Sequence, residues 1–462
     1  MANLLNCGVG SMPFSYLGIP IGANMKHAKH WQPVVDKFTK KLSSWKARNL
    51  SFAGRVTLAK SVLGSLPSYY LSLFHAPRVV INKLERLRRD FVWGKSGMGQ
   101  KLRWIKWEKI LKPKDFGGIG IGGIRDFNLA MISKWWWRFK DDPNQLWAKV
   151  VYSIHYSKSE NKLIPGKASM PGVWKDIGSV DKILANIGIQ IHDKLKVAVG
   201  DGSSVRFWKD KWLTQEPLML RFPNLFRLAK IKNSSVKACY LRVGDGVRWG
   251  WDWLRDPDTL EDWQSLEDLM RLLQDATIKG GKDKWSWENK YGVDFSTKGL
   301  RLDIVAVGEE PGDTGNLVRF AWNPWAPNKC NYLLWRALMG RVASKMGLSN
   351  RGIQLPNVTC DRCGLEEETS DHIFATCLFA RSIWWQVFAW IKVPLPQNIT
   401  CLQQIIDAIH QSPGSKRWRR LVYTVALATT WRIWHARNTK TFEGNFIPIR
   451  KSVDWIKEDA FI

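Results

Sequence analysis

Three cysteines and one histidine between residues 360 and 377 constrain the fold of this chain more than any other feature of its sequence. Their spacing is Cys360-x2-Cys363-x8-His372-x4-Cys377. A C-x2-C pair on a tight turn presents two sulfur atoms to one ion, and Gly364 suits the turn just beyond the pair. Because four ligands leave no open position, the pattern predicts a closed zinc site that is structural and not catalytic.

The second half of this cluster is expected to lie on a helix. Thr369 or Ser370 can cap that helix, and His372 and Cys377 then lie a little over one turn apart. Two alternatives remain open. A redox C-x-x-C pair needs a strand before it and a helix at its first cysteine, whereas Pro356 and a polar turn come first here. Plain burial of the thiols is the other alternative.

The charge of the chain is strongly basic and uneven. It has 70 Lys and Arg against 41 Asp and Glu, and residues 1–150 carry 26 basic and 8 acidic side chains. Such a field attracts polyanions, namely nucleic acid or anionic lipid. The sequence lacks a signal-peptide pattern, an apolar run of roughly 18 to 20 residues and a disulfide framework. We therefore expect a nuclear or cytoplasmic protein without a membrane partner.

Three amphipathic helices are predicted in the basic region. The first buries a face that includes Trp31 and Phe38, the second is capped by Ser51 and extends to about Leu66, and the third ends at Gly94. Basic residues alternate with tryptophans from residue 83 to 115, which favours a nucleic-acid groove over a solvated helix face. The candidate contacts are Lys37, Lys40, Lys41, Arg86, Arg88, Arg89, Lys101, Arg103 and Lys106.

Two further motifs in this region are interpreted as structural. Gly118, Gly120 and Gly123 match a dinucleotide-binding pattern, but no buried strand precedes them. They are expected to lead into a helix that contains three consecutive tryptophans. The adjacent Asp141 and Asp142 follow that helix and precede a proline, so a polar turn is expected there and not a catalytic metal site.

From about residue 195 the periodicity becomes that of β-strands. Alternating residues flank Asp201-Gly202 and the Asp245-Gly246 pair, which predicts two hairpins, and a third strand pair is expected at 284–296. Residues 255–275 have the pattern of an outward-facing acidic helix. Ser296 is expected to cap the next helix, and residues 307–316 are the best candidate for a linker.

Several segments resemble plant LINE-type (non-LTR) retrotransposon reverse transcriptases. The stretches MPFSYLGIPIG, SFAGRVTLAKSVLGSLPSYYL, FVWG, FGGIGI and KWWWRF are similar to the region after the polymerase core. The stretch FAWNPWAPNKCNYLLWRAL, the cysteine cluster and RSIWW resemble the zinc-binding domain that ends those proteins. The stretch WRIWHARN is similar to their last segment, so the resemblance runs from about residue 12 to about 446.

The resemblance implies roles for particular residues. Phe14, Tyr16, Leu17 and Gly18 would correspond to the primer-grip strand, and residues 26–150 to the helical thumb that holds the template–primer duplex. The cysteine cluster would hold the family's zinc ion. The palm that carries the metal-binding aspartates would precede Phe14, where only 13 residues are present. We therefore expect the C-terminal part of such an enzyme, without its catalytic palm.

The expected fold class is α+β, mainly α, with DNA or RNA as partner and structural zinc as cofactor. Two alternative functions stay open: a polymerase active only with a palm from another chain or a missing upstream exon, and a relic or host-adopted protein without catalytic activity. The expected domains are a primer-grip-like remnant (1–25), a basic helical thumb-like domain (26–150), a tryptophan-rich middle region with β-hairpins (151–306), a zinc-binding domain (317–395) and a C-terminal helical tail (400–462).

Overall fold

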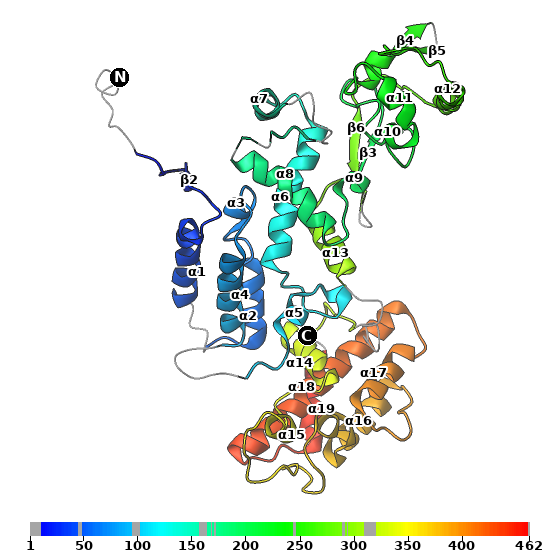
Figure 1. Cartoon of the computed structure of the whole chain (residues 1–462). Helices are drawn as coiled ribbons and strands as arrows, with labels where there is room; N and C mark the ends of the chain where they lie inside the picture. The colour runs from blue at the N-terminus through cyan, green and yellow to red at the C-terminus, as the bar shows by residue number, and fades with distance from the viewer. Residues whose placement is uncertain are drawn as a thin grey trace. The chain divides into compact units, whose positions relative to one another are not determined.

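The computed structural model of the chain (Figure 1) describes residues 11–44, 49–94, 102–156, 164–167, 169–170, 172–243, 246–288, 292, 294–308 and 320–460. These residues form a mainly helical structure with three two-stranded antiparallel sheets, in agreement with the expected fold class. None of their helices is both long enough and apolar enough to cross a lipid bilayer. Most of the linker candidate, 307–316, lies outside them.

The chain separates into two compact units. Unit 1 comprises residues 1–39, 64–86 and 122–315, and unit 2 comprises residues 40–63, 87–121 and 316–462. The predicted thumb region therefore contributes to both. One helix, residues 78–92, is divided between the units, and its hydrogen bonds explain why. Glu85 accepts a hydrogen bond from Ile124 N in unit 1, whereas the Val92 carbonyl accepts one from Arg55 in unit 2.

Two helices contribute residues to both units, and the remaining elements belong to one unit each. The shared helices are α1 (Gln32–Ser44) and α4 (Arg78–Val92). Unit 1 contains β1 (Phe14–Tyr16), β2 (Ile19–Ile21), α3 (Ser68–Leu71), α6 (Ile124–Asp141), α7 (Leu146–His155), α8 (Val173–Ala185), α9 (Ile191–Lys194), β3 (Leu195–Ala198), α10 (Leu218–Arg221), α11 (Pro223–Leu228), β4 (Tyr240–Val243), β5 (Gly246–Trp249), α12 (Leu260–Gln274), β6 (Lys284–Trp287) and α13 (Thr297–Val307). Unit 2 contains α2 (Phe52–Ser61), α5 (Trp107–Leu111), α14 (Asn328–Leu338), α15 (Lys345–Ser349), a π-helical turn (His372–Thr376), α16 (Leu378–Ile391), α17 (Leu402–Gln411), α18 (Lys416–Glu443) and α19 (Ile449–Ala460).

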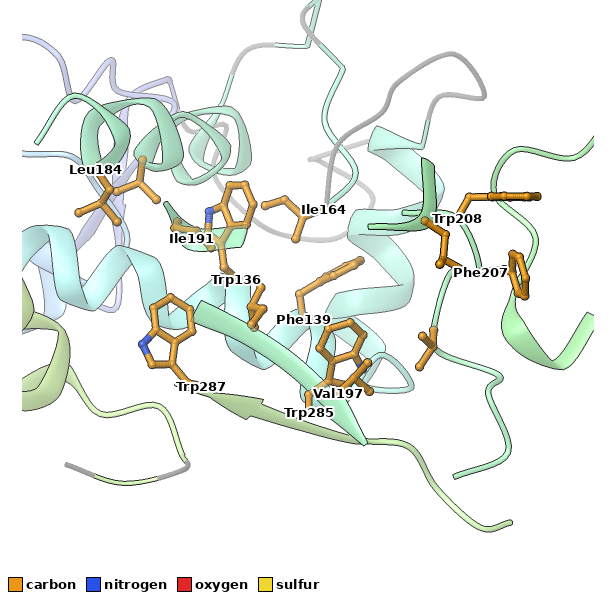
Figure 2. Close-up of a cluster of buried hydrophobic side chains, with 14 of the residues drawn as sticks. Trp136, Phe139, Ile164, Leu184, Ile191, Val197, Phe207, Trp208, Trp285 and Trp287 are labelled. Carbon is orange, nitrogen blue, oxygen red and sulfur yellow. The ribbon is translucent and has the colours of Figure 1, made fainter. Parts of the chain in front are cut away.

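The core of unit 1 combines aliphatic side chains with a set of large aromatic ones. Figure 2 shows Trp136 and Phe139 of α6 beside Trp285 and Trp287 of β6, and all four are buried. The neighbours of Trp136 in sequence use other partners, since Trp135 Nε1 donates to the Ser72 carbonyl. Large apolar surfaces of this kind supply most of the free energy of folding.

Only part of the predicted strand pairing is correct. Strands β4 and β5 form the hairpin expected around residues 245–246, although Asp245 itself lies outside the described residues. The hairpin expected at Asp201-Gly202 is wrong, because β3 pairs instead with β6 across more than 80 residues. The third strand pair was expected at 284–296, and residues 289–291 and 293 of it lie outside the described residues. The pattern of alternation identified the strands, but it could not identify their partners.

Capping residues and helix boundaries were predicted more successfully. Ser51 and Ser296 accept hydrogen bonds from Gly54 N and Gly299 N at the starts of α2 and α13. The second helix ends at Ser61 and not at about Leu66. The glycine-rich stretch leads into α6 as expected, and Gly118 is required there because a Cβ atom would lie 2.1 Å from the Lys112 carbonyl oxygen.

The C-terminal tail belongs to unit 2. Helix α18 packs against α14, α16, α17 and α19. Its residues from Val422 to Thr430 are all buried, so no face of this stretch is left for solvent. A helix buried on every side requires neighbours around it. The zinc-binding segment and the tail therefore form one helical unit.

Candidate metal centre

The turn that carries the first two cysteines is fixed by backbone hydrogen bonds. Cys360 N donates to the Glu366 carbonyl at 2.9 Å, and Gly364 N donates to the Cys360 carbonyl at 2.8 Å. Gly364 has a φ of +69°, a conformation that glycine adopts without steric cost. The local sequence thus places Cys360 and Cys363 on one tight turn, as expected.

The histidine and the last cysteine are brought together by a widened helical turn. Thr369 Oγ1 accepts a hydrogen bond from His372 N at 3.0 Å, so Thr369 caps this segment. Ser370 instead donates to the Ala337 carbonyl. Residues His372–Thr376 form a π-helical turn, which Cys377 N closes by donating to the His372 carbonyl at 2.9 Å. Such turns occur often at functional sites.

The ligand atoms of the four side chains lie close enough together to surround one tetrahedrally coordinated ion. Their ligand atoms all lie within 4.8 Å of one another, and Cys363 Sγ lies 3.3 Å from His372 Nε2. Zinc–sulfur bonds of about 2.3 Å in a tetrahedron place ligand atoms about 3.8 Å apart, so the cluster has the size that zinc requires. Among the described residues, no other group of three or more His, Cys, Asp and Glu side chains has this arrangement.

A carboxylate outside the cluster orients the histidine. Glu366 Oε2 lies 2.8 Å from His372 Nδ1, which leaves Nε2 directed at Cys363. A carboxylate in this position fixes the tautomer and the orientation of a zinc-bound histidine. The fit of the donor atoms and this contact together support a resident zinc ion that shapes the fold.

The surroundings of Cys360 and Cys377 shift the pKa values of the two thiols in opposite directions. A hydrogen bond with Cys377 and the N–H groups of Cys363 and Arg362 lower the pKa of the Cys360 thiol to about 4, although burial opposes this change. The same contact raises the pKa of Cys377. The Arg362 guanidinium lies over the rings of Phe379 and Phe446, 3.5 and 4.0 Å from their centroids. Burial lowers the pKa of Arg362 to about 10.

A buried ion pair connects this turn to α18. Glu368 and Arg437 are 0% and 4% exposed, and Arg437 Nε donates to Glu368 Oε2 at 3.1 Å. Glu368 Oε1 also accepts a hydrogen bond from Lys345 N at 2.9 Å. Glu366, Glu368 and Arg437 were not identified from the sequence. Arg437 lies between His435 and Asn438 in a polar part of α18, so no local pattern marked this pair.

The candidate nucleic-acid contacts are divided between the two units, with Lys37 and Arg86 in unit 1 and the others in unit 2. Arg88 is 1% exposed, and its guanidinium donates to the Ile121 carbonyl at 3.4 Å, so it is a core residue and not a surface contact. Lys101 lies outside the described residues. Arg89 is half-buried, and Arg103 pairs with Asp90 at 3.0 Å. The exposed members are Lys37, Lys40, Lys41, Arg86, Arg103 and Lys106.

The tryptophans among these basic residues are part of the core of unit 2. Trp93, Trp104 and Trp107 are at most 9% exposed. Arg351 lies 4.3 Å from the centroid of Trp104. The alternation of basic and aromatic residues therefore reflects internal packing, and these rings are not available to stack on bases.

The primer-grip-like residues form the β1–β2 hairpin, whose turn is Leu17-Gly18. Phe14, Tyr16 and Leu17 are 47%, 62% and 76% exposed. Gly18 has a φ of +78°, and its carbonyl accepts a hydrogen bond from Tyr70. This hairpin therefore presents a row of large apolar side chains to solvent.

The adjacent aspartates lie where the sequence predicted, at the end of a helix. Asp141 is the last residue of α6 and Asp142 follows it. Asp142 accepts a hydrogen bond from Gln145 at 2.8 Å and lies 3.8 Å from Lys282. A hydrogen bond from Gln145 and an exposed ion pair with Lys282 account for the Asp142 carboxylate.

Comparison with known proteins supports the zinc assignment. A family described as zinc-binding in reverse transcriptase matches residues 308–384. An Arabidopsis thaliana protein named "Putative ribonuclease H protein" is 28% identical over 363 residues, 77% of this chain and 55% of its own length. An uncharacterized mitochondrial protein of the same plant is 26% identical over 153 residues, 33% of this chain and 95% of that protein. This chain thus spans about half the length of the first relative. Through residues 308–384, the chain is similar to the zinc-binding region of reverse transcriptases.

Proposed function

We propose that this chain is a nucleic-acid-binding C-terminal segment of a LINE-type retrotransposon reverse transcriptase, and that zinc stabilises its C-terminal region. The observation that carries the binding proposal is the basic start of α18. Lys416, Arg417, Arg419 and Arg420 are all exposed there. We call these four residues the α18 basic cluster.

The position of this cluster is unfavourable for the helix itself. The N-terminal end of a helix carries partial positive charge, so cations in its first turn destabilise it. Helix α18 has no acidic residue in that turn. No carboxylate of the described residues forms an ion pair with the four cations. These four cations therefore reduce the stability of the helix. A polyanionic partner would offset this cost, because its negative charges would compensate the cations.

Exposed indole rings lie beside the cluster. Trp418 and Trp325 are 39% and 44% exposed, and the Arg420 guanidinium lies 5.2 Å from the centroid of Trp325. Cations that track phosphates together with aromatic faces that stack on bases are typical of single-strand binding surfaces. The α18 basic cluster and its neighbouring indole rings therefore support binding to nucleic acid, in which the cations contact phosphates and the rings stack on bases.

Fluorescence anisotropy with labelled single-stranded and duplex oligonucleotides tests the proposal. If phosphates dominate, log affinity falls linearly with log salt, with a slope of several units between about 50 and 200 mM. The triple variant R417A/R419A/R420A should bind about tenfold or more weakly and lose about one unit of slope per arginine. The matched control K230A/K279A/K298A removes the same charge from exposed lysines of unit 1.

Three outcomes contradict the proposal. Affinity that does not change with salt would exclude a phosphate-based contact. An equal loss in both triple variants would show that net charge and not the α18 basic cluster is responsible. Binding to vesicles of anionic lipid but not to oligonucleotides would assign the cluster to a membrane surface.

A second candidate function is RNA-directed DNA polymerisation with a palm supplied from outside the described residues. The exposed apolar side chains of the β1–β2 hairpin favour it, because such a patch is typical of a docking surface. Adding the palm-bearing core of the same element should then produce primer extension, and Tyr16→Ser should reduce it. Absence of extension by the combined proteins would remove this candidate.

A further inference from the structure

A cavity in unit 1 has no role in the zinc centre or the α18 basic cluster. Its volume is about 570 Å³, and it lies between α7, the end of α6 and the segment Ser203–Arg206. We call it the α7 pocket. The segment belongs to the Gly-Asp-Gly stretch that alternation had wrongly assigned to a hairpin. The actual structure of that stretch explains how the pocket wall is built.

The wall is organised around one buried carboxylate. Asp283 is 4% exposed, and its two oxygens accept hydrogen bonds from the backbone N–H groups of Gly200, Gly202 and Ser204, each at 2.8 Å. The Ser204 hydroxyl donates to the same group at 2.9 Å. A Cβ at position 200 would lie 2.5 Å from the Gly281 carbonyl oxygen, and Gly202 has a φ of +72°. Both glycines are therefore needed for the chain to wrap around Asp283.

Basic groups predominate around the pocket. Its lining includes Lys140, Lys149, Arg206 and Lys282, with Asp283 as the one carboxylate. Lys140 and Arg206 share the buried Asp210 just behind the wall, at 3.2 and 2.6 Å. One carboxylate between two cations leaves an excess of positive charge there. The pocket therefore favours an anionic ligand.

One side of the pocket is aromatic. Tyr152 of α7 and Tyr156, the residue that follows this helix, both line it, with ring centroids 4.7 Å apart and an interplanar angle of 28°. Tyr152 is 50% exposed. Lys149 lies one turn before Tyr152 on the same helix, and its side chain is exposed. A flat ring beside cations is the combination that recognises a nucleobase and its phosphate.

We propose that the α7 pocket binds one nucleotide of a single-stranded nucleic acid, with the base against the Tyr152 ring and a phosphate toward Lys149 and Lys282. This inference rests on the proposed nucleic-acid binding and adds a second contact point, in unit 1. The cavity is large enough for a nucleotide, since small-molecule sites commonly range from about 300 to 1,000 Å³.

The test uses the full chain and a fluorescein-labelled oligothymidylate, read by anisotropy. Tyr152→Ala should weaken single-strand binding about tenfold and leave duplex binding unchanged, because a paired base is not free to stack. Lys149→Glu should weaken single-strand binding to a similar extent. The matched controls are Tyr69→Ala, whose side chain is also 50% exposed, and Lys298→Glu. Both controls should bind normally.

Photocrosslinking provides a readout that does not depend on any variant. A strand that contains 5-iodouracil should crosslink to a peptide that includes Tyr152 or Tyr156. If the wild-type chain binds no oligonucleotide, both this inference and the proposed function are overturned. If it binds, but Tyr152→Ala matches Tyr69→Ala and crosslinks map only to α18, the pocket proposal is wrong and the proposed function stands.

Discussion

The zinc-ligand turn in unit 2 and the glycine loop in unit 1 are both tight turns arranged around buried groups. In the first, the four ligands and the orienting Glu366 all fall within residues 360–377. In the second, Asp283 lies 79 to 83 residues from the N–H groups that donate to it. The spacing of the first could therefore be interpreted from the sequence. The second was mistaken for a hairpin because its partner is remote.

The two turns also differ in the strength of the interaction that holds them. Structural zinc sites contribute about 10 to 16 kcal/mol in peptide systems. A hydrogen bond to a charged group contributes about 1.5 to 3 kcal/mol. Loss of the metal should therefore unfold the structure around it, whereas loss of the Asp283 charge should weaken unit 1 and leave it folded.

The largest expected effect is that of removing a zinc ligand. Purified chain should contain about one zinc ion, and Cys360→Ser or Cys377→Ser should remove it and unfold about residues 355–392. Elemental analysis and hydrogen exchange measure the two results. Cys401→Ser is the control, since this half-exposed cysteine lies outside the cluster. A wild-type chain without zinc, or unchanged protection in the ligand variants, would contradict the assignment.

Breaking the buried ion pair behind the zinc turn should have the next largest effect. Arg437→Met leaves the Glu368 carboxylate buried without its partner, which should lower the free energy of unfolding by about 3 to 5 kcal/mol. The double variant E368Q/R437M should recover part of this loss. Arg432→Met on the same helix breaks the partly exposed pair with Asp459 and should cost less than about 1 kcal/mol. Denaturant unfolding distinguishes these values, and similar losses for both arginines would be the contrary result.

A smaller effect is expected at the glycine loop. Asp283→Asn removes the negative charge of the side chain. It also replaces one carboxylate oxygen, an acceptor, by an NH2 group, a donor, which then faces the N–H group of Ser204 or Gly200. The expected loss in the free energy of unfolding is about 3 kcal/mol. The control, Asp201→Asn, changes a partly exposed carboxylate of the same loop, and its effect should be below about 1 kcal/mol. An Asp283 variant as stable as its control would show that the loop does not depend on this carboxylate.

The smallest effect is expected from substituting the adjacent aspartates, Asp141 and Asp142. Nucleotidyl transfer by two metal ions needs rigidly held carboxylates, and Asp141 and Asp142 instead end a helix. We predict no primer extension by this chain alone with magnesium or manganese, and unchanged stability within about 0.5 kcal/mol in D141N/D142N. Extension that disappears in the double variant would overturn this assignment.

Local features were the ones that could be predicted from the sequence. The spacing of the zinc ligands, the caps at Ser51 and Ser296 and the end of α4 shortly before Gly94 depend on residues a few positions apart. Hydrogen-bonding geometry over one turn is nearly the same in any protein, so residue types at fixed spacing are enough. The exposure of a lysine on an amphipathic helix follows from the same periodicity.

The sequence by itself determined the mainly helical class, the metal ligands and the basic character of the chain. Only the tertiary structure decided which strands pair, which charges are buried and where one unit ends. Arg88 and Arg86 are two residues apart on one helix, yet Arg88 is in the core and Arg86 is exposed. The partners of Asp283, Glu368 and Arg437 lie about 70 to 80 residues away. Long-range pairs are chosen by packing over the whole chain, and no local spacing records that choice.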